Sequence, residues 1–192
     1  GESAHAQALE PLLSLLKDSS LRVRFHAAVA LGKLRSAKAI NPLLELVLKN
    51  DDDDAFLRHG AVMGLVGSTK TDPKVLLELT SSSHSSVRLA AILALRRHAD
   101  PGISIFLKDE DLYLVTETAR AIHDDFSIPD ALPALAEILD RSDLEGEPLI
   151  RRAINANFRV GRPVDAERLA RYASNLSAPE NMRTTALACL AL

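Results

Sequence analysis

The stretch Val23–Leu34, VRFHAAVALGKL, returns in the same pattern as VRLAAILALRRH at Val87–His98. Each copy begins with valine and arginine, and Ala or Leu then recurs every three or four positions. That spacing places the apolar residues on one face of an α-helix. Because one amphipathic helix recurs along the chain, the sequence predicts a stack of similar units.

The aliphatic–arginine pair marks the period of this repeat, which is about 30 to 34 residues. A double interval separates the third pair from the fourth, and the missing copy falls on Val115 and Thr116. One repeat is therefore predicted to be degenerate. The arginines, which we interpret as structural anchors of the repeat, are Arg24, Arg58, Arg88, Arg151 and Arg183.

Residues at two fixed offsets from each anchor, or from Thr116, are predicted to face the core because both offsets lie on one side of a helix. The residues three positions after the anchor are Ala27, Ala61, Ala91, Ala119, Ile154 and Ala186. Those seven positions after it are Leu31, Leu65, Leu95, His123, Phe158 and Leu190.

A second helix is predicted after each anchored helix, with proline in its first turn, where an amide hydrogen has no intrahelical acceptor. Asp- or Ser-rich links such as KDSS, KNDDDD and SSSHSS then lead to the next unit. The prolines are Pro11, Pro42, Pro73, Pro101, Pro133 and Pro163.

These patterns predict an all-α fold, a right-handed α-α superhelix of about five repeats, in which residues 1–192 form a single array. A second helix without a first is expected from about Ala4 to Lys17, and Leu192 falls inside the apolar run of a first helix. We therefore expect a segment excised from a longer chain, with Gly1 as a cloning remnant. Uncovered apolar ends favour end-to-end self-association.

The composition fits thin aliphatic layers between helices, since 47% of the 192 residues are hydrophobic but only 4% are aromatic. The net charge of -3 disfavours a nucleic-acid partner, which needs excess Lys and Arg on one face, although a local basic patch is compatible with it. No apolar run reaches the roughly 18 residues of a membrane span. The single cysteine, Cys189, is predicted to be a small buried hydrophobe and leaves the redox compartment open.

The polar motifs favour structural roles. We expect the anchor guanidinium groups to bind Asp side chains or carbonyls in adjacent turns. The run Asp51–Asp54 lacks the ligand spacing of a calcium loop and is expected to cap the next helix. His123, Asp124 and Asp125 resemble a metal-hydrolase dyad, but His123 occupies a core position of the repeat, which favours a packing role.

No catalytic residue, cofactor site or metal site is predicted, because HExxH, GxSxG, a glycine-rich phosphate loop and CxxCH are all absent from the sequence. Function is therefore expected on a surface. In stacks of this kind the second helices line the concave side. The candidate contacts there are Glu45, Lys49, Glu78, Arg168 and Arg171.

VRFHAAVALGKL and VRLAAILALRRH resemble the HEAT-like, armadillo-like repeats of phycobilisome lyases, and the likeness runs over nearly the whole chain. The resemblance implies a HEAT-type α-solenoid. It leaves the function open, because some relatives are bilin lyases and others are scaffolds.

Three strings carry a narrower resemblance, to the HEAT segment of large secreted bacterial proteins described as membrane-bound dehydrogenases. The strings are LRHGAVMGL at Leu57–Leu65, ARAIHDDFSIPDALPALA at Ala119–Ala136 and PLIRRAINANFRVG at Pro148–Gly161. In that family a sugar-dehydrogenase-like propeller precedes the repeats and a cytochrome c domain with CxxCH follows. The resemblance implies a periplasmic or cell-surface parent that is a PQQ- or haem-linked dehydrogenase, with no cofactor on this segment.

The leading interpretation is a non-catalytic scaffold, spacer or protein-interaction module. The alternative is a HEAT-fold enzyme such as a bilin lyase or an alkylpurine DNA glycosylase. A glycosylase needs a basic groove with base-reading side chains, which the mixed charge and few aromatics disfavour.

If the anchor arginines hold one repeat against the next, Arg88→Ala leaves their partners unsatisfied. We expect it to lower the free energy of unfolding by about 1 to 3 kcal/mol, measured by thermal or urea denaturation. An unchanged melting temperature contradicts the anchor role.

Overall fold

The computed structural model describes residues 2–124 and 128–192, with side chains from residue 7 onward. Every regular element in these residues is a helix, which confirms the predicted all-α solenoid. The chain divides into two compact units, Gly1–Asp100 and Pro101–Leu192, here called unit 1 and unit 2. Gly1 and Asp125 lie outside the described residues.

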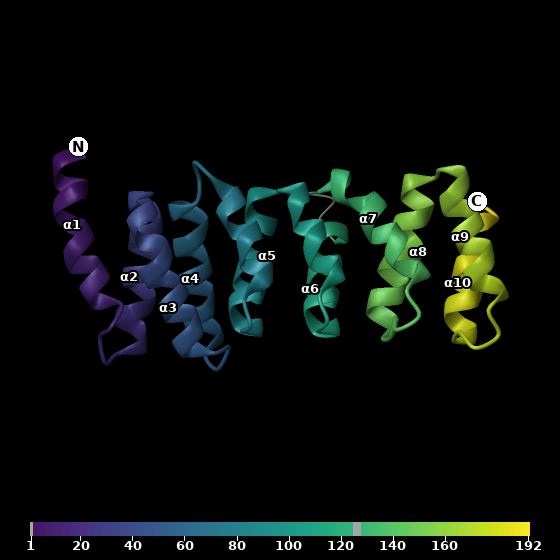
Figure 1. Cartoon of the computed structure of the whole chain (residues 1–192), viewed down its shortest axis with the longest axis horizontal. Coiled ribbons are helices and arrows are strands. Elements are labelled where there is room, and N and C mark those ends of the chain that lie inside the picture. The colour runs from purple at the N-terminus through teal and green to yellow at the C-terminus, as the bar shows by residue number, and fades with distance from the viewer. Residues whose placement is uncertain (1, 125–127) are drawn as a thin grey trace. The chain divides into compact units, whose positions relative to one another are not determined.

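In unit 1 the helices follow one another from α1 to α5 across the view of Figure 1, and the anchored helix α2 packs against the next anchored helix, α4. The anchored helices α2, α4 and α5 alternate with second helices, two of which include or consist of 3-10 turns. The elements are α1 (Glu2–Leu15), α2 (Leu21–Leu34), η1 (Ala37–Ala39), α3 (Ile40–Asn50), α4 (Ala55–Ser68), η2 (Pro73–Ser81) and α5 (Ser85–His98).

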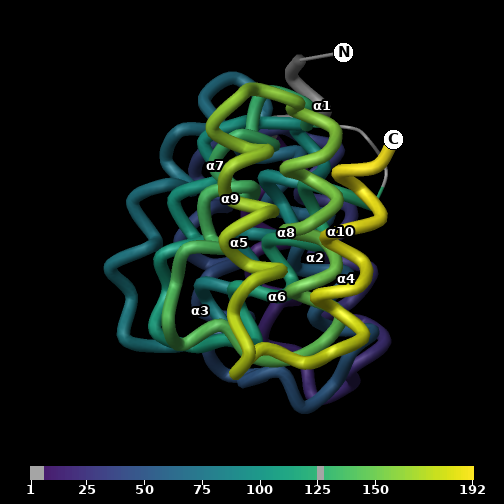
Figure 2. The backbone as a smooth tube through the Cα atoms, turned by 90° about the vertical axis from the view of Figure 1, so that its right-hand side faces the viewer, coloured from purple at the N-terminus to yellow at the C-terminus, as the bar shows by residue number. Residues whose placement is uncertain are grey.

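Unit 2 repeats the arrangement, with α6, α8 and α10 as the first helices. Viewed from its end, α9 and α10 occupy separate layers of the unit (Figure 2). The elements are η3 (Pro101–Lys108), α6 (Leu112–His123), η4 (Pro129–Ala131), α7 (Leu132–Glu137), η5 (Ile138–Asp140), α8 (Glu147–Val160), α9 (Pro163–Ser174) and α10 (Glu180–Leu190).

Link residues and prolines set the helix ends. Asp54 caps α4 by accepting a hydrogen bond from the Leu57 amide at 2.6 Å, as the sequence predicted for the acidic run. Five of the six prolines lie in the first turn of a second-helix element or in the short 3-10 helix that leads into it. Pro11 is the exception, because α1 begins at Glu2 and Pro11 lies inside it. One lost intrahelical hydrogen bond is tolerated there, where α1 packs on α2.

The core follows the predicted offsets closely in unit 1 and less closely in unit 2. All residues three positions after the anchor are buried, and so are Leu31, Leu65 and Leu95. At the second offset Phe158 and Leu190 are exposed, contrary to the prediction, and His123 is half-buried. In α8 it is Asn157 that faces inward, 1% exposed, because it has polar partners there.

Glycines allow α2 and α4 to pack backbone against backbone in unit 1. A Cβ atom added to Gly67 meets the Gly32 carbonyl oxygen at 1.9 Å, and one added to Gly32 meets the Met63 carbonyl oxygen at 2.6 Å. Neither obstacle is a flexible side chain. The distance between the two helix axes therefore depends on the absence of side chains at Gly32 and Gly67.

Three of the five anchor arginines bind groups that precede their own helix. Arg88 and Arg183 donate to carbonyls at the end of the preceding second helix, those of Ser82 at 2.7 Å and Ala173 at 2.9 Å. Arg58 instead binds Asp52 in the preceding link. The other two anchors depart from the expected pattern.

Arg24 and Arg151 do not bind the preceding second helix or link in the way that the sequence predicted. The buried Nε of Arg24 has no hydrogen-bond partner within the described residues. Arg151 is exposed and pairs with Glu147 of its own helix, so it holds no neighbouring repeat in the way predicted. In the degenerate copy, the Thr116 hydroxyl donates to the Leu112 carbonyl at 2.8 Å. Arg151→Ala is therefore a matched control for Arg88→Ala, with an expected effect of under about 0.5 kcal/mol.

Gly67→Ala tests the backbone contact. Because the new methyl group meets a carbonyl rather than a movable side chain, we expect the free energy of unfolding to fall by about 2 kcal/mol, despite the better helix propensity of alanine. The neighbouring Ser68→Ala variant is the control, because it removes a buried hydroxyl that lacks a hydrogen-bond partner and should be neutral or stabilising. Equal effects of the two variants in urea denaturation contradict the contact's importance.

Candidate functional site

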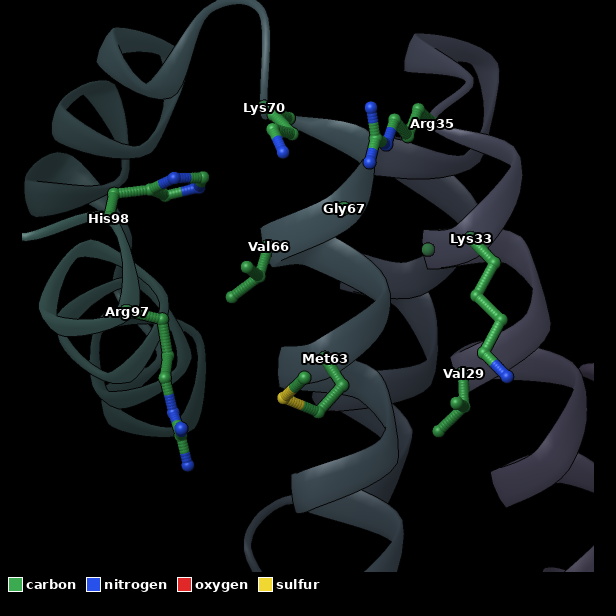
Figure 3. A pocket seen from close by; sticks show the side chains of 10 residues that line it. Val29, Lys33, Arg35, Met63, Val66, Gly67, Lys70, Arg97 and His98 are labelled. Atoms are coloured by element: carbon green, nitrogen blue, oxygen red, sulfur yellow. The ribbon is translucent and has the colours of Figure 1, made fainter.

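A cavity of about 520 Å³ lies on unit 1 along the C-terminal halves of the first helices α2, α4 and α5 (Figure 3). No residue of a second helix is among its lining residues, so it lies away from the second helices, on which the sequence placed function. We call it the cationic cavity. Its lining residues are Val29, Gly32, Lys33, Arg35, Met63, Val66, Gly67, Lys70, Arg97 and His98.

Half of these lining residues are basic and none is acidic. Lys33 and Arg97 lie in the last turns of α2 and α5, while Arg35 and Lys70 follow the ends of α2 and α4. Cations are favoured at such positions because the last carbonyls of a helix carry partial negative charge. All four side chains are exposed and form no ion pair within the described part of the chain.

His98, the fifth basic residue, is half-buried and held in place by Thr69. The Thr69 hydroxyl donates to the Leu65 carbonyl at 2.8 Å, so it accepts from Nε2 of His98 at 3.0 Å. Burial lowers the pKa of His98 below 6.5, with Lys70 acting in the same direction and Asp100 opposing it. His98 is therefore mostly neutral at pH 7 and presents Nδ1 as an acceptor.

The α4 side of the cavity is apolar. Met63 and Val66 lie on α4 between α5 and α2, with Val29 on the α2 side, whereas Arg35, Lys70 and His98 surround one end (Figure 3). Gly32 and Gly67 complete the lining where the two helices touch. The site thus combines a cationic rim with an aliphatic wall.

The surface candidates from the sequence fall into two groups. Glu45, Lys49, Glu78 and Arg171 are exposed, and Glu45 and Lys49 line a smaller cavity of about 210 Å³ beside Arg24. Arg168 is different: it is only 6% exposed, so its interpretation as a contact for a partner is wrong. Arg171 is exposed but bound to Asp140 at 2.8 Å.

Arg168 is the centre of a buried polar network in unit 2. Its guanidinium donates to Asp140 at 2.7 Å, to Asp165 at 2.9 Å and to the Asn157 side-chain oxygen at 2.8 Å. Burial alone would lower the pKa of Arg168, but the two carboxylates outweigh it and raise the pKa. Asn157 in turn donates to the Ala136 carbonyl at 2.9 Å, which ties α8 to α7.

The His123–Asp124 pair is also structural. The Asp124 carboxylate accepts two hydrogen bonds from Arg152, each of 2.8 Å, and His123 Nε2 lies 2.8 Å from the Asn155 side-chain oxygen. These contacts join α6 to α8. A carboxylate already bound to arginine is a poor metal ligand, and no group of three metal-ligating side chains occurs among residues 2–124 and 128–192.

The basic residues of the cavity were not singled out from the sequence, although a signal was present. Each anchored helix of unit 1 has a basic side chain in its last turn or just beyond it, as in GKLR, STK and RRH. The helical repeat brings such positions to the same end of neighbouring helices. Searching for charge at equivalent positions of successive repeats would have found the cluster.

Two other features of the chain give no evidence for a functional site. Cys189 is half-buried rather than fully buried, and burial raises the pKa of its thiol, which disfavours the reactive thiolate. Within the described residues, no helix is both long enough and apolar enough to span a membrane.

Comparisons with known proteins point to repeats. Residues 1–66 match the family model described as HEAT repeats. Two solved structures of engineered proteins are similar to this chain. The first is 20% identical over 95% of this chain and 97% of its own length, with a TM-score of 0.47. The second is 19% identical over 96% of this chain and 95% of its own length, with a TM-score of 0.45. Human deoxyhypusine hydroxylase in complex with glycerol is 18% identical over 94% of this chain and 82% of its own, with a TM-score of 0.31. A search of curated proteins gave no match.

The Asp124–Arg152 pair gives unit 2 a pH-dependent contribution to stability. The hydrogen bonds from Arg152, with a smaller contribution from His123, lower the pKa of Asp124 to about 2. Because the pKa is lower in the folded state, the stabilisation is complete above about pH 4 and is lost as the pH falls towards 2. Asp124→Asn should cost about 1 kcal/mol at pH 7, a figure reduced for partial exposure.

Urea denaturation at pH 7 and near pH 2 measures this contribution, and the wild type and Asp124→Asn should converge at the lower pH. Asp130→Asn, an exposed carboxylate of the same unit, is the control and should show no such convergence. A difference for Asp124→Asn that is independent of pH contradicts the ion-pair explanation.

Proposed function

We propose that this chain is a non-catalytic α-solenoid that binds other proteins or neighbouring domains. One observation carries the proposal: the candidate acid–base side chains of unit 2 are bound within the fold, whereas four exposed cations of the cationic cavity are not. His123, Asp124 and Arg168 contact other side chains or carbonyls of unit 2. The unpaired charge of unit 1 lies where a partner can reach it.

The repeat architecture supports the same function. A stack of helical pairs exposes a large surface relative to its core, and such stacks use that surface for binding. Here the second helices present exposed charges at Glu45, Lys49 and Glu78. The first helices of unit 1 present the cationic cavity. A partner can therefore be recognised on either surface.

For the parent protein, we propose a large secreted dehydrogenase-like haem protein in which this segment separates or docks a propeller and a cytochrome c domain. The support is the resemblance of the three strings at Leu57–Leu65, Ala119–Ala136 and Pro148–Gly161. On this proposal the segment itself holds no cofactor, its location is periplasmic or on the cell surface, and its partners are the flanking domains. End-to-end association through the apolar ends is part of the same proposal.

The enzyme alternative, a bilin lyase or an alkylpurine DNA glycosylase, has no comparable support in the geometry. The lining of the cationic cavity contains no hydroxyl or thiol to act as nucleophile, so its one imidazole, His98, has no nucleophile among the lining residues to activate. It also contains no Phe, Tyr or Trp ring to stack on a flipped base. We therefore prefer the binding function.

Three observations test this function. The parent gene should encode a propeller upstream and CxxCH downstream, and these domains, produced separately, should bind this chain saturably in calorimetry. Titration of the purified chain with haem or pyrroloquinoline quinone should give no stoichiometric absorbance change. Stoichiometric cofactor binding contradicts the scaffold assignment, and a parent without these domains contradicts the proposed context.

Charge reversal locates the binding surface. Lys49→Glu and Glu78→Lys change the second-helix surface, whereas Lys70→Glu changes the cationic cavity, and all three residues are exposed. If Lys49→Glu and Glu78→Lys abolish binding of the flanking domains, the second-helix surface binds them; if Lys70→Glu abolishes it, the cationic cavity does. If no variant of either set alters binding, docking does not use the surfaces proposed here.

A further inference from the structure

We propose that the cationic cavity binds an acidic segment of a partner protein, one in which carboxylates alternate with aliphatic side chains. The inference rests on the proposed binding function and names the chemistry of the ligand. It depends on the juxtaposition of four exposed cations with an aliphatic wall formed by Val29, Met63 and Val66.

The positive charge exceeds what the helix ends require. Three helix C-termini lie at the cavity, each carrying roughly half a negative charge, and together they offset about 1.5 positive charges. Lys33, Arg35, Lys70 and Arg97 supply four full charges. Asp100, which acts electrostatically on His98, removes at most one of these. A surplus of positive charge therefore remains for an external anion.

The carboxylate side of the ligand follows from how this charge is distributed. Lys33 and Arg97 extend along the two sides of the cavity, and Arg35 and Lys70 lie near one end (Figure 3). The charges are thus spread around the rim instead of converging on one point. Several spaced carboxylates match this distribution better than one compact anion.

The aliphatic side of the ligand follows from the wall. Met63 and Val66 are half-buried, so each keeps surface that a partner can cover. Methionine adapts its shape to varied apolar side chains, which suits it to peptide binding. The lining contains no Phe, Tyr or Trp, and its one imidazole, His98, is held by Thr69. This disfavours a nucleic acid, because single strands are held by stacking on aromatic rings.

The open rim favours a segment of a protein over a small molecule. A small ligand is usually enclosed over most of its surface. Here the four cations are exposed, and the cavity of about 520 Å³ opens to solvent between them. An extended segment can lay alternate side chains on the wall and on the rim.

A fluorescein-labelled peptide in which glutamate alternates with leucine tests the site by fluorescence anisotropy. We expect saturable binding that weakens with added salt, and much weaker binding of a control peptide with glutamine in place of glutamate. Lys70→Glu and Arg97→Glu should each weaken binding about tenfold. Lys38→Glu makes the same charge change at an exposed residue of unit 1 outside the cavity, and should weaken binding less than twofold.

Several results overturn the proposal. Absence of saturable peptide binding shows that the cations only stabilise the C-terminal ends of the helices. Equal effects of Lys38→Glu and Lys70→Glu show that the peptide responds only to the overall charge of the protein. Tighter binding of a single-stranded oligonucleotide, abolished by Lys70→Glu, assigns the cavity to nucleic acid instead. Circular dichroism of each variant checks that the fold is intact. If the flanking domains bind the chain but the peptide does not, the proposed binding function is retained and only the assignment of this cavity is overturned.

Discussion

Unit 1 depends on the contact between the backbones of α2 and α4 at Gly32 and Gly67. A Cβ atom on Gly67 has no room, since the Gly32 carbonyl oxygen lies 1.9 Å from its position. Because the helices touch there, the residues that follow their ends, Arg35 and Lys70, lie beside one cavity. The same contact thus sets the helix packing and the separation of the charges on the surface.

Unit 2 joins its second helices to the first helix α8 through buried polar contacts. Arg168 joins α9 to Asp140 and to Asn157 of α8, and Asn157 continues to the Ala136 carbonyl. These hydrogen bonds are 2.7 to 2.9 Å long, so the desolvation cost of burying the Arg168 charge is offset.

The division between bound and unbound charge connects the fold with its proposed function. In unit 2 the described Arg, Asp and His side chains at α6, α8 and α9 are largely bound to one another. In unit 1 the cations at the ends of α2, α4 and α5 have no carboxylate among the lining residues. A surface with surplus charge and an apolar wall is suited to recognition, and the aliphatic core beneath it holds that surface in place.

The sequence by itself determined the helices, their order and much of the core of unit 1. Leu31, Leu65 and Leu95 are buried as the period predicts, and Asp54 caps its helix, because helix periodicity and capping are local properties of the chain. Only the tertiary structure decided that Asn157 faces inward while Phe158 is exposed, and that Arg168 is buried. It also decided that the basic residues of three helices share one cavity. These outcomes depend on which carbonyl, carboxylate or glycine lies opposite a side chain on a neighbouring helix, and periodicity along one helix carries no information about that.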